Sequence, residues 1–242
     1  MIILCSYIVI WGITVYDEIS GGEKQMKMKS IEESYFPDFA LLVLVNVVLL
    51  AIGFRLYNGY FNFTDYPISE LGAVRTRTGL LNSSSRRVFS IQMLFNTLFM
   101  LHMGNQFFRD NSRLHRGYQF FARTTAVGTL IIILPYDINN FIHSIGTGTM
   151  AASILMLTSL GAHEAKIRYA ERGPIILNVI AWIILIIYAL SNALDLQAKQ
   201  IIQKPTLAML GITLLTVTPY MEKQAVSQKQ ETVVQSGQGR NP

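Results

Sequence analysis

The sequence predicts an all-α fold, a polytopic transmembrane bundle of six helices. Hydrophobic residues make up 51% of the 242-residue chain and charged residues only 14%, against about 25% charged residues in ordinary soluble domains. The apolar residues fall into long runs, close to the ~20 residues that a helix needs to cross a bilayer. The basic residues cluster at the ends of these runs, so the net charge of +5 reflects membrane topology and not a nucleic-acid partner.

Each apolar run is expected to be a helix, because a backbone in contact with lipid must satisfy its own hydrogen bonds. The six predicted spans are Phe39–Leu56, Val88–Met103, Tyr118–Leu134, Ile142–Ala162, Ile175–Leu194 and Leu207–Tyr220. They define one transmembrane domain over residues 38–221. Residues 222–242 are rich in Gln, Ser and Gly, and we expect a disordered polar tail there.

The distribution of Lys and Arg predicts the orientation in the membrane. If the first span starts in the cytoplasm, the inner segments hold Lys27, Lys29, Arg109, Arg113, Arg116, Lys166, Arg168, Arg172, Lys223, Lys229 and Arg240. The outer loops then hold only Arg75, Arg77, Arg86, Arg87, Lys199 and Lys204. We therefore expect a multi-pass protein of the cell membrane, with both termini of the six-helix core in the cytoplasm.

Residues 1–25 form an N-terminal extension with three interpretations. Met1–Tyr16 is apolar but short, and it could form a short seventh helix. A signal peptide is disfavoured, since the segment lacks a charged start and a clear cleavage site. Alternatively, the natural protein begins at Met26, because Gly21-Gly22-Glu23 can be encoded by a purine-rich ribosome-binding sequence just upstream.

Six side chains that could bind a ligand would lie on the predicted outer face. Ionisable groups at membrane depth are costly, tend to face the bundle interior and often mark function. We therefore predict one polar pocket there, lined by Ser69, Glu70, Asp65, Asp137, His143 and Asp195. The alternative is that these residues lie in the wet interface and cap helices, and this structural role is favoured for Asp65, Glu70 and Asp195.

Local patterns suggest which of these residues have structural roles. Asp137 or Asn139 could cap the fourth span, and Ser69-Glu70 after Pro67 could open a short interfacial helix. Single polar residues inside spans are expected to form interhelical hydrogen bonds: Asn46, Asn96 and Asn178. Small residues spaced by four on the fourth span predict close helix packing: Ser144, Gly148 and Ala152, with Gly146 and Ala151 adding to that surface. Two sequons, at Asn62 and Asn82, are candidate glycosylation sites.

The residues restrict the chemistry. Cys5 is the only cysteine, which excludes an intramolecular disulfide and cysteine-based metal sites. Only His143 among the four histidines lies on the predicted outer face, so a three-histidine hydrolase site is excluded. We predict neither a metal nor a cofactor.

The segment from Pro67 to Ala73, Pro-Ile-Ser-Glu-Leu-Gly-Ala, resembles the loop signature of the prokaryotic membrane family called domain of unknown function 998. That family's Pro-x-Asp and His-Ser-x-Gly-like motifs correspond to Pro135-Tyr136-Asp137 and His143-Ser144-Ile145-Gly146. The resemblance covers residues 38–221 and extends distantly to the DRAM/Sfk-type six-span proteins. It implies six spans and no assigned activity, and it marks Ser69, Glu70, Asp137 and His143 as a set. Tyr136 and Asn139-Asn140 make this turn more polar than the family pattern.

The resulting functional prediction is a membrane protein whose outer polar pocket binds a lipid headgroup or a small polar ligand, with the lipid bilayer as its first partner. A binding protein is favoured over an enzyme. The enzyme alternative is a lipid-modifying activity in which Asp137 and His143 act as acid and base. A second alternative is a small transporter.

Overall fold

The structure is a computed structural model that describes residues 34–109, 114–196 and 198–221. Within those ranges the protein is all-α, as predicted, with six α-helices, two 3-10 helices and no strand beyond one isolated bridge. The helices are α2 (Phe36–Arg55), η2 (Ile68–Gly72), α3 (Ser83–Arg109), α4 (His115–Ile132), α5 (Asn140–Tyr169), α6 (Gly173–Ala193), α7 (Lys199–Val217) and η3 (Thr218–Tyr220). The predicted N-terminal extension, residues 1–25, and the predicted polar tail, residues 222–242, lie outside the described residues.

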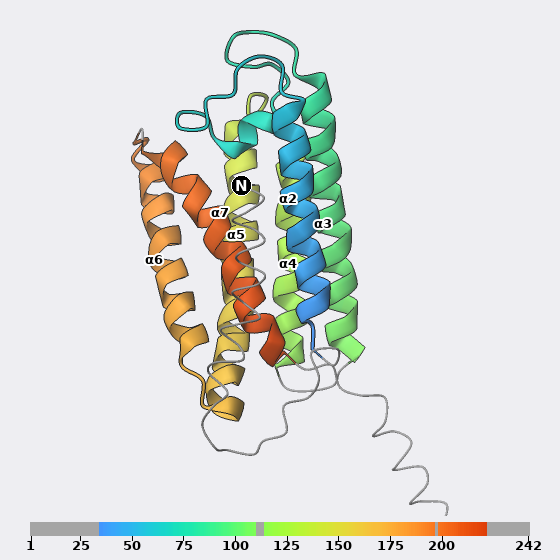
Figure 1. The fold of residues 1–242 in the computed structure, drawn as a ribbon, viewed down its shortest axis with the longest axis vertical. Helices are drawn as coiled ribbons and strands as arrows, with labels where there is room; N and C mark the ends of the chain where they lie inside the picture. Colours follow the sequence, from blue (N-terminus) through green and yellow to red (C-terminus); the bar gives the residue numbers. More distant parts are fainter. Residues whose placement is uncertain (1–33, 110–113, 197, 222–242) are drawn as a thin grey trace, which may run out of the picture.

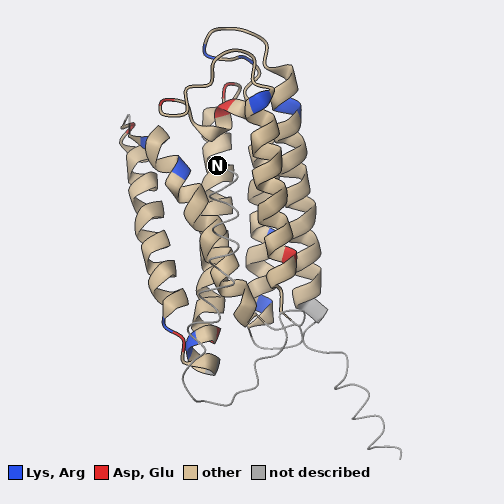
Figure 2. Ribbon diagram, in the orientation of Figure 1, with Lys and Arg blue, Asp and Glu red and all other residues tan. Residues whose placement is uncertain are grey.

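The long helices run alternately in opposite directions (Figure 1). One end of the bundle carries the α2–α3 loop (residues 56–82), the α4–α5 turn and the start of α7, and we call it the loop end. We call the opposite end the terminal end, because the first and last described residues of the bundle meet there. The Tyr35 N–H donates to the Met221 carbonyl at 3.1 Å. Figure 2 shows that charged residues gather toward these two ends.

Four helical segments are long and apolar enough to cross a membrane: Phe36–Arg55, Asn140–Ile167, Gly173–Ala193 and Lys199–Tyr220. They support the membrane class predicted from composition. The last segment begins eight residues before the predicted sixth span, because the helix continues through Lys204 and Pro205, where the apolar run is interrupted. α3 and α4 are long helices too, but polar residues such as Gln92 and Arg123 dilute their apolar character.

The polar residues inside the helices form interhelical hydrogen bonds, as the sequence predicts. Asn46 of α2 and Asn96 of α3 exchange two side-chain hydrogen bonds of 2.7 and 2.9 Å. Gln92 adds a third, from its Nε2 to Asn46 Oδ1 at 2.8 Å. Asn178 of α6 donates to Ser159 Oγ of α5 at 3.1 Å. Reciprocal amide pairs of this kind satisfy side chains that would be costly to bury alone.

The predicted small-residue packing surface of α5 is confirmed for Gly146 and Ala151, which are buried, and is wrong for Ser144 and Gly148. Ser144 and Gly148 are exposed, and a Cβ added to Gly148 would meet nothing within 4 Å. The buried face of α5 lies along His143, Gly146 and Met150 instead. There α4 approaches so closely that a Cβ on Gly128 would lie 2.6 Å from the Met150 nitrogen and 2.9 Å from the Gly146 oxygen. Spacing by four alone could not tell which face of the helix is packed.

Replacing Gly128 by alanine is expected to destabilise the bundle, because its methyl group would meet α5 backbone, which cannot rotate away. Overpacking of this kind costs about 1–3 kcal/mol or more. Gly148→Ala is the matched control, with no atom near its new methyl group. Thermal unfolding in detergent micelles should show a lower midpoint for Gly128→Ala and little change for Gly148→Ala. Equal midpoints would contradict this packing.

Candidate functional site

A buried carboxylate lies at the centre of the loop end. Glu70 is fully buried, with 0% of its surface exposed. It lies in η2, which begins after Pro67 in extended conformation, and this short helix agrees with the interfacial helix expected after Pro67. η2 packs directly on α3, since a Cβ on Gly72 would lie 2.5 Å from the Phe89 ring. Only glycine allows this contact without movement of that ring.

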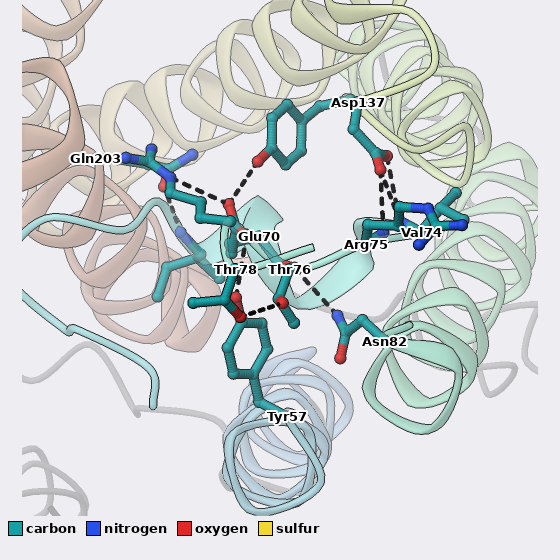
Figure 3. Close-up of polar contacts among 12 residues, drawn as sticks. Tyr57, Glu70, Val74, Arg75, Thr76, Thr78, Asn82, Asp137 and Gln203 are labelled. Atoms are coloured by element: carbon teal, nitrogen blue, oxygen red, sulfur yellow. Dashed lines mark hydrogen bonds and ion pairs between the residues drawn. The ribbon is translucent and has the colours of Figure 1, made fainter. Parts of the chain in front are cut away.

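Two parts of the chain supply donors to the Glu70 carboxylate, namely the α2–α3 loop that contains Glu70 and the distant α4–α5 turn (Figure 3). Tyr57, just after α2, donates its hydroxyl to Oε1 at 3.0 Å. Tyr136, in the α4–α5 turn, donates its hydroxyl to Oε2. Arg77 of the α2–α3 loop brings its Nε to 3.6 Å from Oε2. Both carboxylate oxygens therefore have partners, which a buried charge requires.

The backbone of η2 is held just as firmly. Asn82 directs its Nδ2 toward the carbonyls of Glu70, Leu71 and Ala73 at 3.2–3.4 Å. On the other side, the Gln203 side chain of α7 accepts from the Ile68 N–H at 2.7 Å. Asn82 is fully buried, so its sequon is closed to glycosylation in this fold. Glu70 and the backbone of η2 are thus held by residues next to the ends of α2 and α3, by the α4–α5 turn and by α7.

Asp137 fastens the α4–α5 turn to the same loop. Its carboxylate accepts from the N–H groups of Val74, at 2.9 and 3.1 Å, and of Arg75, at 3.2 Å. The cap of α5 is Asn139, whose Oδ1 accepts from the Ile142 N–H at 3.0 Å. Between the two N-cap candidates from the sequence, the structure therefore selects Asn139.

His143 is buried one helical turn into α5. Its Nδ1 lies 2.9 Å from the Leu134 carbonyl, and its ring lies 6.2 Å from that of Tyr136, measured between centroids. No hydrogen bond between His143 and Asp137 occurs among the described residues. The geometry therefore separates the two side chains that the enzyme hypothesis pairs as acid and base.

The other three predicted site residues lie at the loop end but apart from Glu70's oxygens. Ser69 is half-buried in η2. Asp65 is exposed and accepts from Asn62 Nδ2 at 2.6 Å. Asp195, also exposed, pairs with Lys199 one helical turn later, and this hydrogen bond lowers the pKa of its carboxyl group. Across the described ranges, no side chain of the six predicted residues hydrogen-bonds another of the six.

Two cations, Arg77 and Lys204, lie where the α2–α3 loop meets α7. Neither was predicted to bind a ligand. We call these two residues, together with Gln200, the basic seam. The Arg77 guanidinium carbon lies 4.8 Å from the centroid of the Tyr66 ring, and Lys204 Nζ lies 5.1 Å from that of Phe63. Gln200 lies between them and, with its amide oriented to satisfy its neighbours, accepts from Arg77 Nη2 at 3.0 Å and donates to the Asp65 carbonyl.

The residues that hold Glu70 and η2 do not form a recognisable sequence motif. Tyr57, Arg77, Asn82 and Gln203 have no common spacing with Glu70 in the sequence. The one available signal was Tyr136, an aromatic residue with a hydroxyl group in the unusually polar α4–α5 turn.

No family model, curated protein or solved structure matches the chain. Among the described residues, no group of three or more His, Cys, Asp or Glu side chains could hold a metal ion. Function therefore has to be argued from the geometry of the loop end.

The two tyrosines predict how stability depends on pH. Burial, reinforced by Glu70, raises the pKa of both phenols above their ordinary value of 10.0. Each phenol therefore stays protonated in the folded state at a pH where the unfolded chain already ionises. The resulting stabilisation is complete below pH 10 and is lost as pH rises above it.

Unfolding free energies measured from about pH 8 to pH 11 should therefore fall more steeply for the parent protein than for a Tyr57→Phe/Tyr136→Phe variant. Tyr60→Phe serves as the control, since Tyr60 is 82% exposed, and its profile should follow that of the parent. Parallel profiles for the parent and the double variant would show that these phenols are not held against Glu70.

Proposed function

We propose that the chain is a six-span membrane protein, with its loop end outside and both core termini in the cytoplasm, that binds a phosphate-bearing lipid headgroup at the basic seam. α3 and α4, of 27 and 18 residues, pack against each other, and their other neighbours in the bundle are α2 for α3 and α5 for α4. Because both neighbours are apolar enough to span a bilayer, this packing supports two further spans. Membership of the family named from the Pro67–Ala73 segment remains a proposal.

The observation that carries the binding proposal is the geometry of Arg77. Its Nε faces the buried Glu70, and its guanidinium lies over the Tyr66 ring, while 41% of the side chain is exposed. Glu70 and Tyr66 thus hold the Arg77 side chain in place, while part of its surface stays open to solvent. A fixed guanidinium loses little conformational entropy on binding and matches the geometry of phosphate oxygens.

Lys204 supplies a second positive charge on the same seam. Its Nζ donates to the Thr64 carbonyl at 3.4 Å and to the Gln200 carbonyl at 2.9 Å. An ammonium has three donor hydrogens, so one remains for a ligand. Arg77 contacts the side-chain oxygen of Gln200, and Lys204 contacts its backbone carbonyl; the proposal is that one phosphate group bridges the two cations.

Two acidic residues of the loop end are engaged away from the seam, because Asp137 accepts from backbone N–H groups and Asp195 pairs with Lys199. Glu70 is buried on the inner side of Arg77, and Asp65 lies beside Lys204. In the proposed orientation, the exposed part of Arg77 and the Lys204 ammonium lie at the level of lipid phosphates. The acid–base enzyme alternative receives no support from the separation of Asp137 and His143, and no observation favours the transporter.

Native mass spectrometry of the detergent-purified protein tests the proposal. Phosphatidylglycerol should be retained more strongly than uncharged diacylglycerol. Arg77→Gln and Lys204→Gln should each weaken retention about tenfold, which corresponds to ~1.4 kcal/mol of binding energy. Arg75→Gln is the control, because Arg75 is also an exposed loop cation but donates to the Gly79 carbonyl outside the seam.

Soluble glycerol phosphate distinguishes the two sources of a phosphate group. Competition by glycerol phosphate at micromolar concentration would identify a free small anion as the ligand, whereas failure to compete supports a lipid. Retention of phosphatidylglycerol that is unchanged in both seam variants would contradict the proposal.

A further inference from the structure

We propose that the headgroup bound at the basic seam is zwitterionic, a phosphate joined to a primary ammonium group as in phosphoethanolamine lipids, and that Asp65 receives the ammonium. This inference rests on the proposed function, whose phosphate partners are Arg77 and Lys204. The Asp65 carboxylate lies beside those cations. A purely anionic ligand would not require a carboxylate there.

Asp65 is held in a fixed position but is open to solvent. Asn62 Oδ1 accepts from the N–H groups of Thr64 at 3.0 Å and Asp65 at 3.3 Å, which forms a local turn. Asn62 Nδ2 then donates to Asp65 Oδ2 at 2.6 Å. The second carboxylate oxygen, Oδ1, has no hydrogen-bond partner among the described residues. A carboxylate has about four acceptor positions, so Asp65 retains capacity for an ammonium donor.

Asp65 belongs to the same seam as the two cations. Its backbone carbonyl accepts from Gln200, whose other amide atom accepts from Arg77. Its carboxylate also interacts electrostatically with Lys204, which donates to the neighbouring Thr64 carbonyl. All three residues thus contact Gln200: Arg77 and the Asp65 backbone carbonyl meet its side-chain amide, and the Lys204 ammonium meets its backbone carbonyl. Two positive groups and one negative group in this arrangement complement a ligand that carries phosphate and ammonium a few bonds apart.

The surroundings favour a primary ammonium over a quaternary one. A quaternary ammonium has no N–H to donate and is recognised by the open faces of several aromatic rings. Here Tyr66 and Phe63 each already carry a cation over the ring. A carboxylate with a free oxygen, in contrast, is a partner for N–H donors. The seam therefore discriminates against choline headgroups.

The test compares retention of phosphatidylethanolamine, phosphatidylcholine and phosphatidylglycerol by native mass spectrometry of the full-length protein. The parent should retain phosphatidylethanolamine about tenfold better than phosphatidylcholine. Asp65→Asn should abolish that preference and strengthen phosphatidylglycerol retention, because a negative charge leaves the seam. Asparagine can still accept from Asn62 Nδ2, so the local turn should survive. Asp195→Asn is the control, an exposed carboxylate at the same end that pairs with Lys199.

The outcomes separate the two proposals. If the parent retains the ethanolamine and choline lipids equally while Arg77→Gln still weakens phosphatidylglycerol retention, the ammonium assignment to Asp65 is overturned and phosphate binding stands. If an ethanolamine preference persists in Asp65→Asn, the assignment is likewise overturned. If Arg77→Gln and Lys204→Gln change no lipid's retention, both proposals fail together.

Discussion

The burial of the Glu70 carboxylate constrains the whole loop end. A carboxylate withdrawn from water carries a penalty of several kcal/mol unless donors replace its hydration. The chain provides them from Tyr57, Tyr136 and Arg77. These residues stand after α2, between α4 and α5, and in the α2–α3 loop. Tyr136 joins this loop to the α4–α5 turn, so a loop lifted off the bundle would lose one of the three donors to Glu70.

This arrangement also connects the core of the bundle to the surface that we propose as the binding site. Arg77 contacts Glu70 on its buried side and Gln200 of α7 on its other side. Gln203, almost one turn further along α7, holds the Ile68 N–H at the start of η2. Pro205 follows two residues later, and because proline lacks an N–H, the helix loses one backbone hydrogen bond there. The first turns of α7 are joined to the loop through Gln200 and Gln203.

The sequence predicted those features that depend on local composition and failed where distant segments meet. The apolar runs located the helices, and Asn46 forms the expected interhelical hydrogen bond, with Asn96. Glu70 was one of six candidate site residues, and its donors were not predicted, because their convergence is a property of the fold. The packing row of α5 was assigned to Ser144 and Gly148 because a small-residue spacing of four does not reveal which helix face is buried.

Hydrogen exchange of the α2–α3 loop in lipid nanodiscs tests most directly whether Glu70 fixes this end of the protein. The account predicts slow exchange for the amides of Ile68–Ala73 in the parent, and fast exchange in Glu70→Gln, with exchange in the centre of α5 unchanged. A carboxamide keeps the shape of the side chain but removes the charge that Tyr57, Tyr136 and Arg77 surround. Equally slow exchange in both proteins would show that the loop is held without the buried charge, and would contradict the account.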